Sequence, residues 1–350
     1  MDGMVPKTAT LALGDPVMSV RRFVVLLITL IAMATGGPVN AQNKVVVYSA
    51  NDGNLNRFVF DGFTKETGIA VEGVEAGSGV LFRRIASERE KPLGDIIWGV
   101  SRALLQSNKG LLAPYVSKSK GATPTNFRDP DDLWIGTNVH LLVILQNTKI
   151  LPGAEGPKSW ADLLDPKWKG KIAFTDPANS GSAFTNTTML VQLWGPGDLG
   201  WEKVSHLLAN TKVLNRSTLV FQGVGNGEFP LGMSLEYAGL QWAAGGAPVK
   251  VIYPQDGTVA QMEGVAIIRD GPNTEAAKKF VEYVTRKDVR EEIVRKFFRR
   301  PARDDLDLTK LPGGMPALKD VKLINYDEPG WTAKRAESLQ KIQDIVRNTR

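Results

Sequence analysis

The pattern of apolar and polar positions in the first third of the chain switches between strand and helix periodicity. Residues 45–48 form a continuous apolar run that predicts a buried strand. Leu55, Val59 and Phe63 then recur at helical spacing, and Gly68 stands where that helix should end. This part is completed by strands at 69–74 and 95–98 and a helix at 80–89. Strands that alternate with helices of this length predict a mainly parallel sheet with helices on both faces.

A second α/β segment begins near residue 138. Residues 139–145 are apolar with strand bias, and turn-forming residues follow them. The later pattern predicts strands at 171–174, 231–235, 249–253 and 264–268, and helices at 160–164, after Ser180, and at 201–209, 274–286, 289–297 and 332–347. The chain is therefore predicted to belong to the α/β class.

The predicted elements form two lobes, and the length of the chain suits two domains. We place the crossovers between the lobes near residues 138–145 and 255–265. Lobe 1 is then predicted to contain residues 42–138 and 265–350, and lobe 2 residues 139–264. The C-terminal segment is expected to return to lobe 1, with its last helix on the outside.

The N-terminus resembles a secretory signal peptide. A pair of arginines precedes the apolar run 23–34, and small residues follow, with a cleavage site predicted at 39–41. A membrane anchor is the alternative, but this run is shorter than the roughly 20 apolar residues that span a bilayer. Residues 1–41 are therefore predicted to direct export. Residues 1–17 look unlike a leader, so Met18 is an alternative start.

Composition narrows the class of protein. Cysteine is absent, so an exported chain of this sequence must be stable without disulfides. Lys and Arg number 43 and Asp and Glu 37, a net charge of +6 that is spread along the chain. Binding to nucleic acid is not expected, because no basic stripe with interleaved aromatics occurs. The arginine-rich run 299–303 is interpreted as a solvated face. A mildly positive field favours an anionic ligand.

Catalysis is not expected. The chain has no cysteine and only two histidines, of which His206 lies in a predicted helix and His140 in an apolar strand. No nucleophile elbow or metalloprotease motif is present. The glycine-rich stretch 223–227 precedes a strand rather than following one, unlike a dinucleotide-binding loop. No cofactor and no metal site are predicted.

Hydroxyl and glycine residues follow several predicted strands, where each strand leads into a helix. In open α/β sheets, ligands bind beyond the carboxyl ends of strands, next to helix N-termini. The residues that meet this description are Ser49, Asn51, Gly77, Ser78, Gly79, Ser101, Ser180, Gly181 and Ser182. The last three begin a helix, where free N–H groups and hydroxyls suit a phosphate or carboxylate oxygen. Ordinary capping is the alternative, because Ser and Asn are common N-caps.

Three further residues extend the candidate site. Ser217 belongs to a segment that we expect to reach the same cleft, with Arg216 as a candidate anion clamp or a solvated arginine. Glu236 and Tyr237 end the apolar strand 231–235, so one or both would project into a cleft. A strand-end tyrosine that only packs is the alternative.

A series of local sequences resembles one protein family, in that family's order. These sequences are VVVYSAN, FTKETGIAV, EAGSG with FRRIASEREKPLGDIIWG, WADLLDPKWKGKIAFTDPANSGSA, VGNGEFPLGMSLEY, DGTVAQMEGVAII and AAKKFVEYVTRKDVRE. They resemble the bacterial periplasmic solute-binding proteins of ABC importers, in the ferric-type branch. This resemblance implies a two-lobed periplasmic-binding-protein fold of type II, with a ligand cleft that closes by a hinge. It also implies a periplasmic location and a permease partner in the inner membrane. We expect a monomer.

The resemblance leaves the ligand open among ferric iron, sugar phosphates and organophosphonates. It carries Glu236 and Tyr237 into the family's ligand region, where iron-binding relatives have adjacent tyrosines. Here Ala238 follows Tyr237, so half of the expected phenolate charge is missing. The other candidate residues carry mostly hydroxyls and amides, which hydrogen-bond phosphate and sugar oxygens but hold Fe³⁺ poorly. The sequence therefore favours a sugar phosphate or organophosphonate, with ferric iron as the alternative.

Overall fold

The structure is a computed structural model, and it describes residues 43–153, 156–195, 197–309 and 311–348. The predicted signal peptide at 1–41 lies outside the described residues. A search of the described residues found no helix with the length and apolar character needed to cross a bilayer.

The first sheet is built around a central parallel strand, as the sequence predicts. Its first elements are β1 (Lys44–Ser49), α2 (Gly53–Thr67), β2 (Ala70–Glu75), α3 (Ser78–Ser87), β3 (Ile96–Ser101), α4 (Arg102–Ser107) and β4 (Leu112–Ala113). Strand β1 pairs in parallel with β2 on one side and β3 on the other. Helix α2 begins where Asp52 accepts a hydrogen bond from the Leu55 amide and ends at Gly68, whose φ is 68°.

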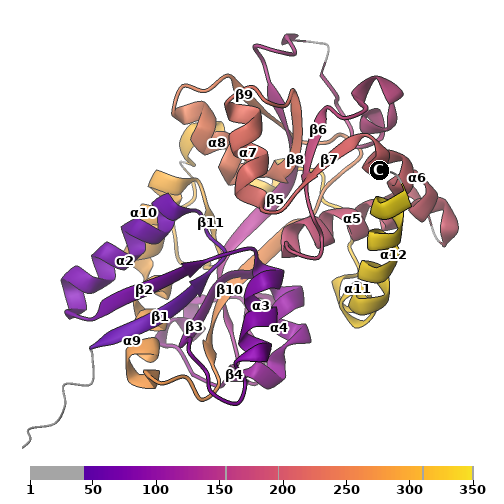
Figure 1. The fold of residues 1–350 in the computed structure, drawn as a ribbon. Coiled ribbons are helices and arrows are strands. Elements are labelled where there is room, and N and C mark those ends of the chain that lie inside the picture. The colour runs from indigo at the N-terminus through magenta and orange to yellow at the C-terminus, as the bar shows by residue number, and fades with distance from the viewer. Residues whose placement is uncertain (1–42, 154–155, 196, 310, 349–350) are drawn as a thin grey trace, which may run out of the picture. The chain divides into compact units, whose positions relative to one another are not determined.

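Two long strands connect the halves of the molecule (Figure 1). They are β5 (Ile135–Asn147) and β10 (Ala260–Ile268), and β5 is buried along its whole length. The first part of β5 pairs antiparallel with β10, and its second part pairs with β8 and β9. One strand thus belongs to both sheets, because its hydrogen-bonding partners change near Leu142.

The second sheet contains another set of parallel strands. Its elements are β6 (Ile172–Thr175), α5 (Gly181–Trp194), α6 (Asp198–Ala209), β7 (Thr211–Leu214), α7 (Ser217–Gly225), β8 (Leu231–Leu235), α8 (Glu236–Ala244) and β9 (Val249–Ile252). Strand β6 pairs in parallel with β7 and β8. The carboxyl ends of these strands lead into α5, α7 and α8, so three helix N-termini gather at one edge of the sheet.

The C-terminal part of the chain contacts both halves. Its elements are α9 (Thr274–Thr285), α10 (Lys287–Phe297), β11 (Arg300–Pro301), α11 (Glu328–Ala333) and α12 (Arg335–Asn348). Apolar side chains of α9 and α10 complete the core around β1 and β3. Trp331 packs on Trp201 of α6, and Ile342 of α12 is buried in the core of the second sheet. The last helix therefore packs on the second lobe rather than returning to the first.

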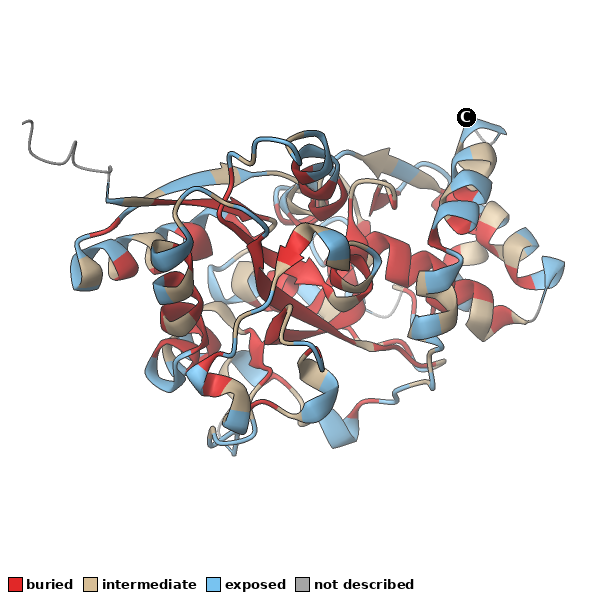
Figure 2. Ribbon diagram, turned by 90° about the horizontal axis from the view of Figure 1, so that it is seen from below, coloured by how far each residue is buried: buried red, intermediate tan, exposed pale blue. Residues whose placement is uncertain are grey.

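The buried residues follow the two sheets and the helix faces turned toward them (Figure 2). Two apolar clusters cover opposite faces of the first sheet, and a third lies in the second. The lobe boundaries themselves stay a prediction.

Several predicted elements differ in detail from the observed ones. Strand β3 continues to Ser101, which caps α4 instead of lying in a loop. Glu236 begins helix α8 instead of ending a strand. The segment at 161–164 is a short 3₁₀ helix. Strand β7 lay outside the sequence prediction because it has only four residues and its first two, a threonine and a lysine, weaken the apolar pattern.

Candidate functional site

A cluster of hydroxyl groups lies at the N-terminus of α5. The Ser180 Oγ lies 3.0 Å from the Ser182 Oγ and 3.0 Å from the Ser217 Oγ. Thr175 donates its hydroxyl to Ser217 at 3.3 Å. The Ser180 Oγ also accepts a hydrogen bond from the Ala183 amide at 3.2 Å, so Ser180 is the N-cap of α5. The structure thus brings together three of the residues predicted from sequence, and we call them, with Thr175, the hydroxyl cluster.

The N-terminus of α3 meets this region from the other lobe. The Gly181 amide donates to the Ser78 Oγ at 2.9 Å, and the Gly79 amide donates to the Asn179 carbonyl at 3.1 Å. A Cβ on Gly79 would lie 2.2 Å from the Ala178 carbonyl oxygen, so a larger residue would push the two segments apart. Gly77 is the N-cap of α3. The predicted loops of the two lobes are therefore in direct contact.

Two buried polar atoms beside this contact have no hydrogen-bond partner in the part of the chain that the structure describes. They are the Ser101 Oγ and the Asn186 Oδ1. A Cβ on Gly181 would lie 2.4 Å from the Ser101 Oγ, which puts that hydroxyl against the start of α5. Asn186 lines a cavity of about 10 Å³ together with Ser182 and Ser217. Buried polar groups are normally paired, so these two atoms stand out as unsatisfied hydrogen-bonding groups.

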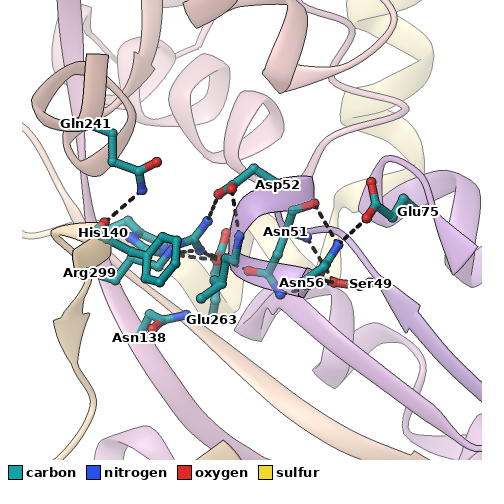
Figure 3. A network of polar contacts seen from close by, with 12 residues as sticks. Ser49, Asn51, Asp52, Asn56, Glu75, Asn138, His140, Gln241, Glu263 and Arg299 are labelled. Atoms are coloured by element: carbon teal, nitrogen blue, oxygen red, sulfur yellow. Dashed lines mark hydrogen bonds and ion pairs between the residues drawn. The ribbon is translucent and has the colours of Figure 1, made fainter. Parts of the chain in front are cut away.

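Ser49 and Asn51 form part of a different group, at the N-terminus of α2. The Ser49 hydroxyl donates to the Asn56 Oδ1 at 2.7 Å, and the Asn51 side-chain amide donates to the Ser49 Oγ at 3.1 Å. Figure 3 shows these side chains turned toward one another, with Asn51 also in contact with Arg299. Both predicted residues already have protein partners, and neither belongs to the hydroxyl cluster.

Arg299 is the centre of a buried charge network (Figure 3). Its guanidinium donates to Asn51 at 2.9 Å and to Asp52 at 2.9 Å. The Glu263 Oε2 lies 3.8 Å from the Arg299 Nη1. The same oxygen lies 2.8 Å from the His140 Nε2, within hydrogen-bonding distance. Arg299 is only 1% exposed, so the interpretation of 299–303 as a solvated face was wrong for its first residues. This network joins α2 to the two long strands.

Glu236 is buried and its carboxylate is fully engaged. Arg300 donates to both Glu236 oxygens at 2.7 Å, and the Tyr253 hydroxyl donates to one of them at 2.7 Å. Burying a charge is costly unless it is paired, and this arrangement pairs both charges. A ligand would have to displace one of these donors to reach Glu236.

Tyr237 is buried between a cation and an aromatic ring. The Arg299 guanidinium lies 3.7 Å from the centre of its ring, and the His140 ring centroid lies 4.8 Å away. Burial raises the pKa of the Tyr237 hydroxyl above its usual value, so the neutral phenol is favoured. Burial also lowers the pKa of His140, although Glu263 opposes this effect. Both side chains are therefore predominantly neutral near pH 7.

Comparison with known proteins identifies the family. The family model described as "Bacterial extracellular solute-binding protein" matches residues 91–328. The chain belongs to this family. It is a family of solute-binding transport proteins rather than of enzymes, and the predicted type II periplasmic-binding-protein fold, with a ligand cleft between two lobes, is confirmed.

Relatives of this solute-binding protein are described with different ligands. A putative 2-aminoethylphosphonate-binding periplasmic protein of Salmonella typhimurium is 28% identical over 305 residues, which cover 80% of this chain and 85% of that protein. Iron uptake protein A1 of Synechocystis is 28% identical over 260 residues, covering 69% and 71%. The periplasmic binding protein AfuA of Actinobacillus pleuropneumoniae, with fructose-6-phosphate bound, is 26% identical, covering 87% and 98%, with a TM-score of 0.78.

These findings confirm the predicted family branch and the periplasmic location. The chain is a periplasmic solute-binding protein of an ABC importer, with a small solute as ligand and a permease as partner. Sequence reasoning did not include Asn186, which looks like an ordinary helix position, or Arg299 among the candidate site residues of this solute-binding protein. No group of three or more His, Asp or Glu residues that could hold a metal ion occurs among the described residues.

Proposed function

We propose that this solute-binding protein captures a small organic phosphate or phosphonate between its lobes. The hydroxyl cluster at the N-terminus of α5 carries the proposal. Hydroxyls and helix N-terminal amides are the groups that bind phosphate oxygens in proteins, and the positive end of the helix dipole favours an anion there. Ser78 and Gly181 add a hydroxyl and an amide that now bond to each other across the lobes.

The unpaired acceptor of Asn186 calls for a hydrogen-bond donor on the ligand. A carboxamide oxygen accepts hydrogen bonds and cannot donate one. A sugar hydroxyl or a ligand ammonium next to the anionic group would satisfy it. This requirement fits a sugar phosphate or an aminoalkylphosphonate equally well.

Ferric iron is the alternative, supported by the iron uptake relative from Synechocystis. Fe³⁺ needs several anionic oxygen ligands. Where iron-binding relatives have two adjacent tyrosines, this chain has Tyr237 followed by Ala238. The pKa of the Tyr237 hydroxyl is raised, and the Arg299 guanidinium lies over the Tyr237 ring. A phenol held neutral beside a cation is a poor iron ligand, so the alternative is less well supported.

We also propose that the lobes divide near residues 138–145 and 255–265, and that the chain works as a monomer without catalysis and without binding nucleic acid. Strands β5 and β10 occupy the proposed crossovers, which supports this division.

Calorimetry with fructose 6-phosphate, 2-aminoethylphosphonate and ferric citrate tests the proposal. We expect heat from a phosphorylated or phosphonate ligand. Each charge-assisted hydrogen bond contributes about 1.5–3 kcal/mol, so Ser182→Ala should weaken that binding by roughly tenfold or more. Ser87→Ala is a matched control, because the exposed Ser87 hydroxyl bonds only to the Arg84 carbonyl of its own helix. Tight ferric binding with a visible phenolate-to-iron band, and no heat from either phosphorus compound, would overturn the proposal.

A further inference from the structure

A groove of about 860 Å³ lies between the two lobes, beside the hydroxyl cluster. Its walls come from α2 of the first lobe and from α7 and α8 of the second. Arg216 and Thr218 line the groove, and Ser217 between them belongs to the hydroxyl cluster. The groove therefore opens next to the site proposed for the phosphate group, and its volume suits a small-molecule ligand.

Charged side chains from both lobes line this groove. They are Asp52, Arg57 and Glu75 from the first lobe and Arg216 from the second. The formal charges of these four side chains sum to zero. What the groove can bind therefore depends on which of the four are free of partners within the protein.

The two carboxylates already have donors within the protein. Asp52 accepts from the Arg299 guanidinium at 2.9 Å and caps α2 through its other oxygen. Glu75 accepts from the Asn56 side-chain amide at 2.8 Å. These contacts hold both acids on the wall of the first lobe and satisfy part of their charge.

The two arginines have no such partners. Neither Arg57 nor Arg216 makes a side-chain hydrogen bond or ion pair with any described residue, whereas most arginines at this end of the cleft, including Arg83 and Arg299, are engaged. A guanidinium presents a rigid set of donors that matches phosphate and carboxylate oxygens. One arginine comes from each lobe, so a single anion could contact both.

We propose that Arg57 and Arg216 bind a second anionic group of the ligand, so that the solute is an elongated molecule with an anion at each end. This inference rests on the proposed function: the phosphate or phosphonate lies at the hydroxyl cluster, and the second anion lies in the groove. A sugar bisphosphate, or an aminoalkylphosphonate that also carries a carboxylate, has this chemistry. Because the second anion joins the two lobes, it also favours the closed conformation.

Paired ligands that differ only in the second anion test the inference by calorimetry. The pairs are fructose 6-phosphate with fructose 1,6-bisphosphate, and 2-aminoethylphosphonate with 2-amino-3-phosphonopropionate. We expect the doubly anionic member of at least one pair to bind about tenfold tighter or more, as charge-assisted hydrogen bonds predict. Arg57→Gln and Arg216→Gln should each remove most of this advantage and leave the affinity for the singly anionic member nearly unchanged.

Arg89→Gln is the matched control, because Arg89 is another exposed arginine without a partner among the described residues, and it lies outside the groove. If the singly anionic ligand binds as tightly as its partner, or if the arginine variants keep the advantage, the inference is wrong while the proposed function stands. If no member of either pair binds, the proposed function is wrong, and the inference, which rests on it, is wrong as well.

Discussion

At the scale of single residues, the site is defined by polar atoms whose hydrogen bonds are incomplete. Most buried polar groups of this chain have partners, as protein interiors require. Asn186, which lines a small cavity, and Ser101, which lies against Gly181 at the start of α5, are among the exceptions. That cavity, of about 10 Å³, is near the size that holds one water molecule, so it is too small for a whole solute. The incomplete bonds therefore mark the place where a ligand would contribute most.

Replacing Asn186 with leucine tests whether its side chain contacts the ligand or only supports the fold. Removal of an unpaired buried polar group carries no loss of a native hydrogen bond, so Tm should stay the same or rise. Binding of the phosphorylated ligand should weaken by roughly tenfold, because a ligand donor loses its acceptor. Thermal unfolding and calorimetry measure the two effects.

Asn210→Leu is the control for that substitution. The Asn210 side-chain amide donates to the carbonyls of Leu163 and Asp165, at 2.9 and 3.1 Å. Its loss should lower Tm and leave affinity unchanged. The opposite result for Asn186→Leu, a lower Tm with normal affinity, would show that Asn186 only supports the fold.

The buried arginines show that the partners of a charged residue cannot be predicted from a single sequence when they lie far away along the chain. Arg299 and Arg300 pair with Asp52 and Glu236, which are far away along the chain. A local run of charge looks the same whether it faces water or distant carboxylates. The apolar residues next to and within the run, such as Phe297, Phe298 and Ala302, were the available signal that it enters the interior.

At the scale of elements, the C-terminal helices connect the lobes. The Trp331 indole donates to Gln192 of α5, which fixes α11 to the second lobe. Glu328 at the start of α11 accepts from Arg102, the residue that follows Ser101 in the first lobe. Helix periodicity predicts the last helix well, but it contains no information about the lobe on which that helix packs. The sequence therefore placed this segment with lobe 1.

The ion pair between Arg102 and Glu328 should stabilise the closed conformation. A partly exposed pair contributes up to about 1 kcal/mol, which corresponds to roughly a fivefold change in the closed population. Glu328→Gln should therefore weaken ligand binding by a few-fold, mainly through faster dissociation, which stopped-flow measurements would detect. Arg84→Gln is the control, because Arg84 and Glu88 form a comparable pair at the end of α3, and their contacts stay within the first sheet and its helices. Equal dissociation rates for Glu328→Gln and the native protein would contradict this role.

At the scale of the whole molecule, strands β5 and β10 occupy the proposed crossovers between the lobes. The sequence predicted crossovers in the regions that these strands occupy, because long apolar runs followed by turns are visible without a structure. It also predicted the order of strands and helices in the first sheet. The contacts between α3 and the loop before α5 could not be predicted from the sequence, since they depend on how the two lobes meet. Arg83 adds to them by donating to the Ala178 carbonyl at 2.9 Å and to Asn179 at 2.8 Å.

Those contacts predict that a side chain at Gly79 would hold the lobes apart. A Cβ there would lie 2.2 Å from a backbone oxygen of the opposite lobe, and backbone cannot yield as a flexible side chain can. Ligand should reduce the radius of gyration of the native protein in solution scattering, because hinge closure is the usual transition of such binding proteins. Gly79→Val should stay expanded at saturating ligand and bind more weakly. Gly110→Val should behave like the native protein, since nothing lies within 4 Å of a Cβ at Gly110. Full compaction and native affinity in Gly79→Val would show that closure does not bring α3 against the start of α5.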